Sequence, residues 1–93
     1  MAFLEHGDRR FQTLAYHDAI RHDGPALELA ELVDREVGPE LMTVLFFPPD
    51  PGKAEVLLTN GSLPLPIITA FLKEAGREQR RVDEAYPERK ARS

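Results

Sequence analysis

The hydrophobic pattern is most pronounced in residues 41–47, LMTVLFF, which are apolar on both of the faces that a β-strand presents. Successive side chains of a strand point to opposite sides of a sheet, so Leu45 lies on one face and Phe46 on the other. Neither face of such a strand is suited to water. We therefore predict a central strand that is covered on both sides, either by helices of the chain or by a second copy of it.

A second apolar run, residues 54–59, follows a loop at 48–53 that contains three prolines and a glycine. Such a loop ends one strand and stiffens the turn, so the two runs predict a β-hairpin. Two strands alone are marginal in water. Either residues 11–16 supply a third strand, or the edge of the hairpin pairs with a second copy in a dimer.

Residues 25–37 predict an amphipathic helix that begins after Gly24 and stops at Gly38 and Pro39. The apolar positions at helical spacing are Leu29, Leu32, Val33 and Val37. Glutamate, aspartate and arginine occupy much of the remaining surface, as on a solvated helix face.

A longer helix is predicted from Pro64 to Pro87, because proline is tolerated in the first turn of a helix and ends one that it follows. One apolar stripe runs along it through Ile68, Leu72, Ala75, Gln79, Val82 and Tyr86. Phe71 widens the stripe. Gly76 is a weak point, because glycine in a helix interior costs about 1 kcal/mol relative to alanine.

Residues 8–22 are ambiguous between helix and strand. A helix places Phe11, Leu14 and Ala15 on one stripe, whereas a strand over residues 11–16 places Leu14 and Tyr16 on one face. We favour the helix. The predicted fold is therefore α+β, a single domain over residues 1–87 with an N-terminal helix (or strand), an amphipathic helix, a β-hairpin and a long C-terminal helix packed on the sheet. Residues 88–93 are expected to be a disordered tail.

Composition narrows the classes of function. The chain has 93 residues, a net charge of -4 and no cysteine, so it lacks disulfides, a thiolate nucleophile and an attractive field for phosphate backbones. Nucleic-acid binding is therefore disfavoured. No apolar stretch approaches the ~18 residues of a membrane span, and no secretion signal begins the chain, so we expect a cytoplasmic protein without membrane contact.

Two His-Asp pairs are the main candidates for chemistry, His17 with Asp18 and His22 with Asp23. On a helix, Asp18 and His22 share a face and could supply two metal ligands, but zinc requires at least three from the protein. A His-Asp pair could also orient a general base, yet no nucleophile is identifiable. We therefore predict no catalytic residue, no cofactor and no metal site.

By elimination, the sequence favours a non-enzymatic accessory or regulatory protein that acts through protein-protein interaction with an unknown partner and forms a homodimer. The expected interface comprises Phe46, Leu72, Val82 and Tyr86, because the apolar stripe of the last helix continues beyond Gly76, further than a small core requires. The alternative is a small-molecule or metal-binding protein, possibly an enzyme, with a pocket between sheet and helices near His17 and His22.

Overall fold

One antiparallel sheet and one long helix form the part of the chain that the computed structural model describes, which comprises residues 2–48, 50, 52–59 and 61–85. The elements are β1 (Ala2–His6), β2 (Arg9–Asp18), β3 (Gly24–Val33), β4 (Glu36–Phe46), β5 (Ala54–Leu58) and α1 (Leu65–Ala85). Strands that follow one another in the chain are also neighbours in the sheet, in the order β1-β2-β3-β4-β5. The strands at the two edges of the sheet are therefore β1 and β5.

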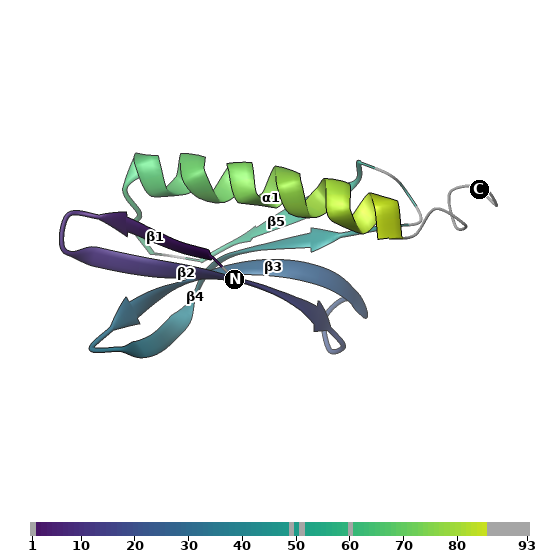
Figure 1. Ribbon diagram of the computed structural model, residues 1–93. Coiled ribbons are helices and arrows are strands. Elements are labelled where there is room, and N and C mark those ends of the chain that lie inside the picture. The colour runs from purple at the N-terminus through teal and green to yellow at the C-terminus, as the bar shows by residue number, and fades with distance from the viewer. Residues whose placement is uncertain (1, 49, 51, 60, 86–93) are drawn as a thin grey trace.

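The helix covers one face of this sheet (Figure 1). Alternation along each strand directs every second side chain toward it. The core between helix and sheet consists of Phe11, Leu27, Leu29, Met42, Val44, Phe46, Ile67, Phe71, Ala75 and Val82. Within the described residues, no helix or second sheet lies on the opposite face, which we call the open face.

The amphipathic helix predicted for residues 25–37 is wrong, because these residues belong to β3, a turn and the start of β4. The true period is two: Leu27 and Leu29 face α1, whereas Glu28 between them faces the other way. A two-residue turn at Asp34 and Arg35 joins the strands, both with positive φ (52° and 68°), as in the turns that match strand twist. This turn has no glycine, so the spacing of apolar residues suggested a continuous helix.

The N-terminal helix favoured for residues 8–22 is also wrong. Residues 9–18 form β2, and Gly7, with φ of +59°, lies in the turn that joins it to β1. The strand alternative describes this region correctly, with Leu14 and Tyr16 on one face. The fold is thus a five-stranded antiparallel sheet with a single C-terminal helix.

The β-hairpin and the C-terminal helix are confirmed. Strands β4 and β5 pair antiparallel with Phe46 opposite Ala54, and the Pro64 carbonyl accepts the amide hydrogens of Ile67 and Ile68 (3.0 and 3.2 Å) where α1 begins. The buried stripe of α1 is Ile67, Phe71, Ala75 and Val82. It is rotated from the predicted stripe, so that Leu72 lies on a flank. The predicted tail lies outside the described residues.

Both faces of β4 are buried over residues 42–46 within a single chain. Thr43 and Leu45 point to the open face, where only 1% and 6% of their surface is exposed. Their neighbours on β3 are Glu28 and Ala26, and Ala26 is itself fully buried. No helix of the described residues covers this face, so that part of the expectation is wrong, and Thr43 and Leu45 are buried without a second copy.

Candidate functional site

The two histidines singled out by the sequence contact different partners. His17 Nε2 is 3.0 Å from Asp23 Oδ1, and both side chains are exposed. His22 Nε2 donates to the Pro25 carbonyl (3.1 Å) and its ring meets Phe47 edge to face. In the described part of the chain, no three His, Cys, Asp or Glu side chains gather where a metal ion could be held.

Asp18 has a different partner from the one the sequence suggested. Its Oδ1 accepts the amide hydrogens of Ile20 and Arg21 (3.1 and 2.9 Å), and its Oδ2 accepts Arg21 Nε (2.7 Å). The Arg21 amide is the main reason that the pKa of Asp18 lies below its ordinary value. Arg21 also donates to Glu40 Oε1 (3.0 Å) and to the Tyr16 hydroxyl (2.8 Å). The guanidinium thereby fastens the β2–β3 loop to the sheet.

A β-bulge in β4 directs Glu40 toward this cluster. Met42 pairs with Leu29 and Glu40 pairs with Ala30, so Leu41 is the extra residue between them. Leu41 packs against the core while Glu40 accepts a hydrogen bond from the Thr43 hydroxyl. Glu28 lies beside this group, and burial, followed by the charge of Glu40, raises the pKa of Glu28. These bonds join the members of the cluster to one another, which favours a structural role.

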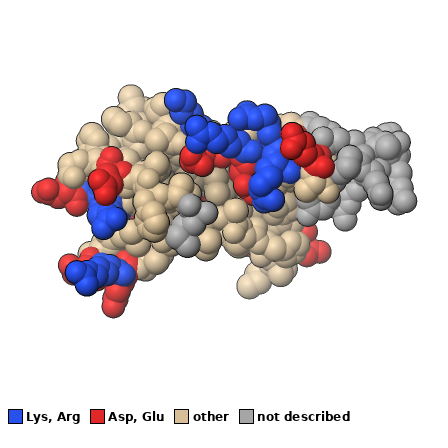
Figure 2. Space-filling view, in the orientation of Figure 1, with Lys and Arg blue, Asp and Glu red and all other residues tan. Residues whose placement is uncertain are grey.

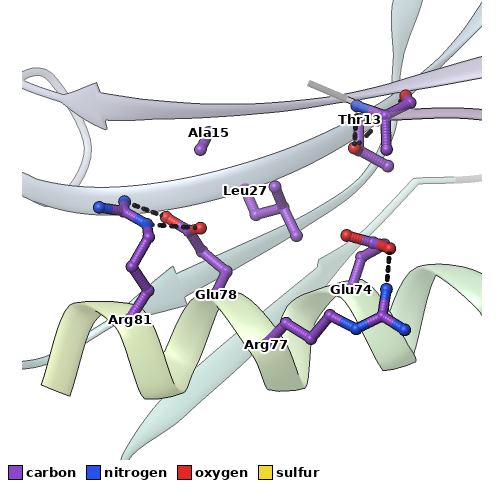
Figure 3. Close-up of a pocket in the computed structure, with 8 residues that line it drawn as sticks. Thr13, Ala15, Leu27, Glu74, Arg77, Glu78 and Arg81 are labelled. Atoms are coloured by element: carbon purple, nitrogen blue, oxygen red, sulfur yellow. Dashed lines mark hydrogen bonds and ion pairs between the residues drawn. The ribbon is translucent and has the colours of Figure 1, made fainter. Parts of the chain in front are cut away.

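A groove runs between α1 and the strands β1 and β2. Its floor is formed by Thr13, Ala15 and Leu27, and α1 contributes Glu74, Arg77, Glu78 and Arg81 (Figure 3). It encloses about 190 Å³, below the ~300 Å³ at which pockets for drug-sized ligands begin. A second hollow continues from Ala15 toward His17 and Pro25. The region between sheet and helix that the sequence suggested for a ligand therefore exists, and it is narrow.

The charges along this groove are balanced within the helix. Arg77 Nη1 donates to Glu74 Oε1 (2.5 Å) and Arg81 Nε donates to Glu78 Oε1 (3.0 Å), each pair three residues apart. Figure 2 shows basic and acidic side chains interspersed along the helix on the face in view. An anionic ligand would have to compete with these carboxylates for both guanidinium groups.

The opposite flank of the helix and strand β5 carry apolar side chains that remain exposed. We call Val56, Leu58, Leu65 and Leu72 the β5 surface; their exposed fractions are 46%, 73%, 72% and 47%. Val56 and Leu58 pair with the core residues Val44 and Met42 and so point to the helix side of the sheet. They stay exposed because α1 packs mainly against β1, β3 and β4.

Leu65 and Leu72 extend this surface from the helix. They are seven residues apart, about two turns, and therefore share one flank. That flank is opposite Glu74 and Arg77, which face β1 and β2 in the groove. Because β5 lies at the other edge of the sheet, the two leucines are directed to the β5 side.

The structure separates the four residues expected at the interface. Phe46 and Val82 are buried in the core of one chain, where 1% and 2% of their surface is exposed. Leu72 belongs to the β5 surface, and Tyr86 lies outside the described residues. Sequence reasoning missed Val56 and Leu58, although the alternation along residues 54–59 places both on one apolar face of an edge strand.

Comparison with known proteins adds no relative. No protein-family model, curated protein or solved structure matches this chain.

Although α1 has 21 residues, no helix in the described part of the chain is both long enough and apolar enough to cross a membrane.

Proposed function

We propose that this is a non-enzymatic accessory or regulatory protein that acts through protein-protein contacts and forms a homodimer. The observation that supports the proposal is the β5 surface, where four of the large exposed apolar side chains gather at one edge of the molecule. Small domains rarely expose contiguous apolar patches unless these serve as contact sites. In a chain of 93 residues, covering this surface would also add to a small stability margin.

Self-association is tested by sedimentation equilibrium over a concentration series that reaches tens of micromolar. We expect the mass of a dimer at the upper end and a shift toward monomer on dilution, because association follows mass action. A monomer throughout the series would contradict the homodimer.

Contact with other proteins is tested separately, by crosslinking in living cells that express the chain. We expect crosslinks to at least one other protein in addition to crosslinks between copies. Crosslinks between copies alone would restrict the function to self-association.

A second candidate function is small-molecule binding in the groove between α1 and β2, because the groove contains a small-residue floor at Ala15 with charged side chains above it. A ligand that binds only the folded state raises its melting temperature. In a thermal-shift screen of metal ions and metabolites, a shift in the wild type that Ala15→Phe removes would favour this candidate. We expect no such shift.

A further inference from the structure

We propose that β5 pairs antiparallel with β5 of a second copy, so that two five-stranded sheets become one continuous sheet with both helices on the same side. This inference rests on the proposed self-association and assigns its interface. It follows from the hydrogen-bonding pattern of β5, from the order of its side chains and from the position of Leu65 and Leu72.

The backbone of β5 has one side free for pairing. The Lys53 carbonyl accepts the Phe47 amide hydrogen (3.2 Å), which makes Lys53 and Phe47 a hydrogen-bonded pair of the β4–β5 ladder. Such pairs alternate along an antiparallel ladder, so Glu55 and Leu57 also bond inward to β4. Ala54, Val56 and Leu58 therefore direct their amide and carbonyl groups outward, away from β4.

The side chains of β5 are compatible with pairing to themselves. With Leu57 opposite Leu57 of the second copy, Val56 lies opposite Leu58 on the helix side, and the reverse pair follows from the twofold axis. Glu55 then lies opposite Thr59, away from its own counterpart. Every apolar residue of Val56 to Leu58 meets an apolar residue, and β5 contains no proline or lysine of the kind that protects edge strands.

The helix flank continues the contact above the sheet. Leu65 and Leu72 point to the β5 side and α1 leaves β5 largely uncovered. A second sheet joined at β5 brings its own Val56 and Leu58 to the same side of the molecule. The leucines of α1 would thereby lose exposed apolar area in addition to that lost by the strands.

The charge distribution opposes contact between two copies through charged patches and leaves the β5 surface as the region where they can meet. Two identical chains of net charge -4 repel each other, and any charged patch repels its own image across a twofold axis. The β5 surface carries no charge of its own. It is therefore the region where two copies approach with the least electrostatic penalty and the most apolar contact.

The test combines two changes at β5 with one matched control. Val56→Pro removes an outward amide hydrogen and leaves the inward bonds of Glu55 and Leu57, a position at which edge strands tolerate proline. Leu58→Lys places a cation opposite an apolar residue. The control Ile20→Lys makes the same kind of exchange in the β2–β3 loop, where Ile20 is 96% exposed.

Folding of each variant is first checked by circular dichroism and urea unfolding, and association is then measured by sedimentation. We expect either β5 variant to raise the dimer dissociation constant by about tenfold or more, equivalent to about 1.4 kcal/mol, and Ile20→Lys to leave it unchanged. If Val56→Pro does not fold, Leu58→Lys carries the comparison. A wild-type dimer that both folded variants form equally well would overturn the β5 pairing and leave the homodimer intact.

Amide hydrogen exchange on the wild type gives an independent measurement. On going from dilute to concentrated protein, the Val56 and Leu58 amides should gain protection, while the Leu57 amide, already bonded to β4, should change little. Equal protection of Val56 and Leu58 at both concentrations in a protein that sediments as a dimer would also overturn the pairing. A wild type that stays monomeric would overturn the pairing together with the proposed homodimer.

Discussion

The two edge strands of the sheet, β1 and β5, have the same length but differ in how they are protected. The helix and charged side chains cover β1, whereas β5 is left exposed. At β1, the helix packs against the strand, the Ala2 amide donates to the Thr13 hydroxyl (3.1 Å), and Glu5 pairs with Arg10 on β2 (3.2 Å). At β5, the helix is displaced and apolar side chains remain exposed. Covering and charge are two of the ways in which natural proteins protect a sheet edge, and β1 has both.

The difference indicates that the two halves of the molecule are stabilised by different forces. On the β1 side, the helix presents ion pairs, and Arg9 of β2 donates two hydrogen bonds to Glu31 of β3 (2.9 and 2.8 Å). On the β5 side, the contacts are apolar and part of the apolar surface remains exposed to solvent. Changes in the core and in pH should therefore alter the free energy of unfolding, whereas changes at the β5 surface should alter the dimer dissociation constant.

The largest effect is expected where the helix joins the two halves, at Phe71, which is fully buried. Phe71→Ala should lower the free energy of unfolding by about 3 to 5 kcal/mol, because it removes a large core side chain and leaves a cavity. The neighbouring Leu72→Ala is the matched control and should stay within about 0.5 kcal/mol. Urea unfolding of dilute protein measures both. An equal loss of unfolding free energy in the two variants would show that Leu72 belongs to the core, and the β5 side would then not carry unused apolar surface.

A smaller effect is expected from pH, through the carboxylates that lie around Arg21. Because Asp18 has a pKa below its ordinary value in the folded state, its contribution to stability is present above the unfolded pKa of about 3.9 and is lost as pH falls through the folded value. Asp18→Asn should therefore lower stability at neutral pH and flatten the acid limb of the stability curve. Urea unfolding at a series of pH values from about 2 to about 7 measures this.

Glu28 provides a control of opposite sign. Burial and the charge of Glu40 raise the pKa of Glu28, so its ionised form opposes folding and stability gained from its protonation appears as pH falls through the raised value. Glu28→Gln should leave stability at neutral pH equal or higher. If Asp18→Asn and Glu28→Gln both lowered stability, or both raised it, the ion pair between Asp18 and Arg21 would not be what stabilises the β2–β3 loop against the sheet.

The elements predicted correctly from sequence are those with strong local signals. The hairpin of β4 and β5 follows from two apolar runs around a proline-rich loop, and α1 follows from prolines at its start and a long apolar stripe. The errors came from β2 and β3, which contain residues that suit helices as well as strands. In β3, leucine, alanine and glutamate have high helix propensity, and only pairing with β2 and β4 makes them a strand.

The candidate site was harder to anticipate, since it depends on where the helix lies over the sheet. Leu72 was expected at an interface. Phe71 and Leu72 belong to the same apolar stripe in the sequence, so the sequence does not show that the helix is rotated to bury Phe71 and leave Leu72 on a flank. The exposure of Leu58 results from the displacement of α1 toward β1, a tertiary feature. The contact between Arg21 and Glu40 depends on the bulge at Leu41, which directs Glu40 toward the β2–β3 loop, whereas Asp18 and Tyr16 reach Arg21 from β2 itself.

The smallest effect sharpens the distinction between folding and association. An added Cβ at Gly76 meets only the end of Arg80, at 4.0 Å, so Gly76→Ala is accommodated and should raise the free energy of unfolding by about 0.5 to 1 kcal/mol. The reverse change, Ala70→Gly, should lower it by a similar amount. Gly76 follows Leu72 by four residues and so shares its flank of α1, whereas Ala70 precedes Arg77 by seven residues and lies on the groove flank. The dimer dissociation constant should therefore stay within about twofold in Ala70→Gly, equivalent to about 0.4 kcal/mol. Sedimentation of Ala70→Gly that followed its loss of stability would show that association depends on the fold as a whole and not on a preformed apolar edge.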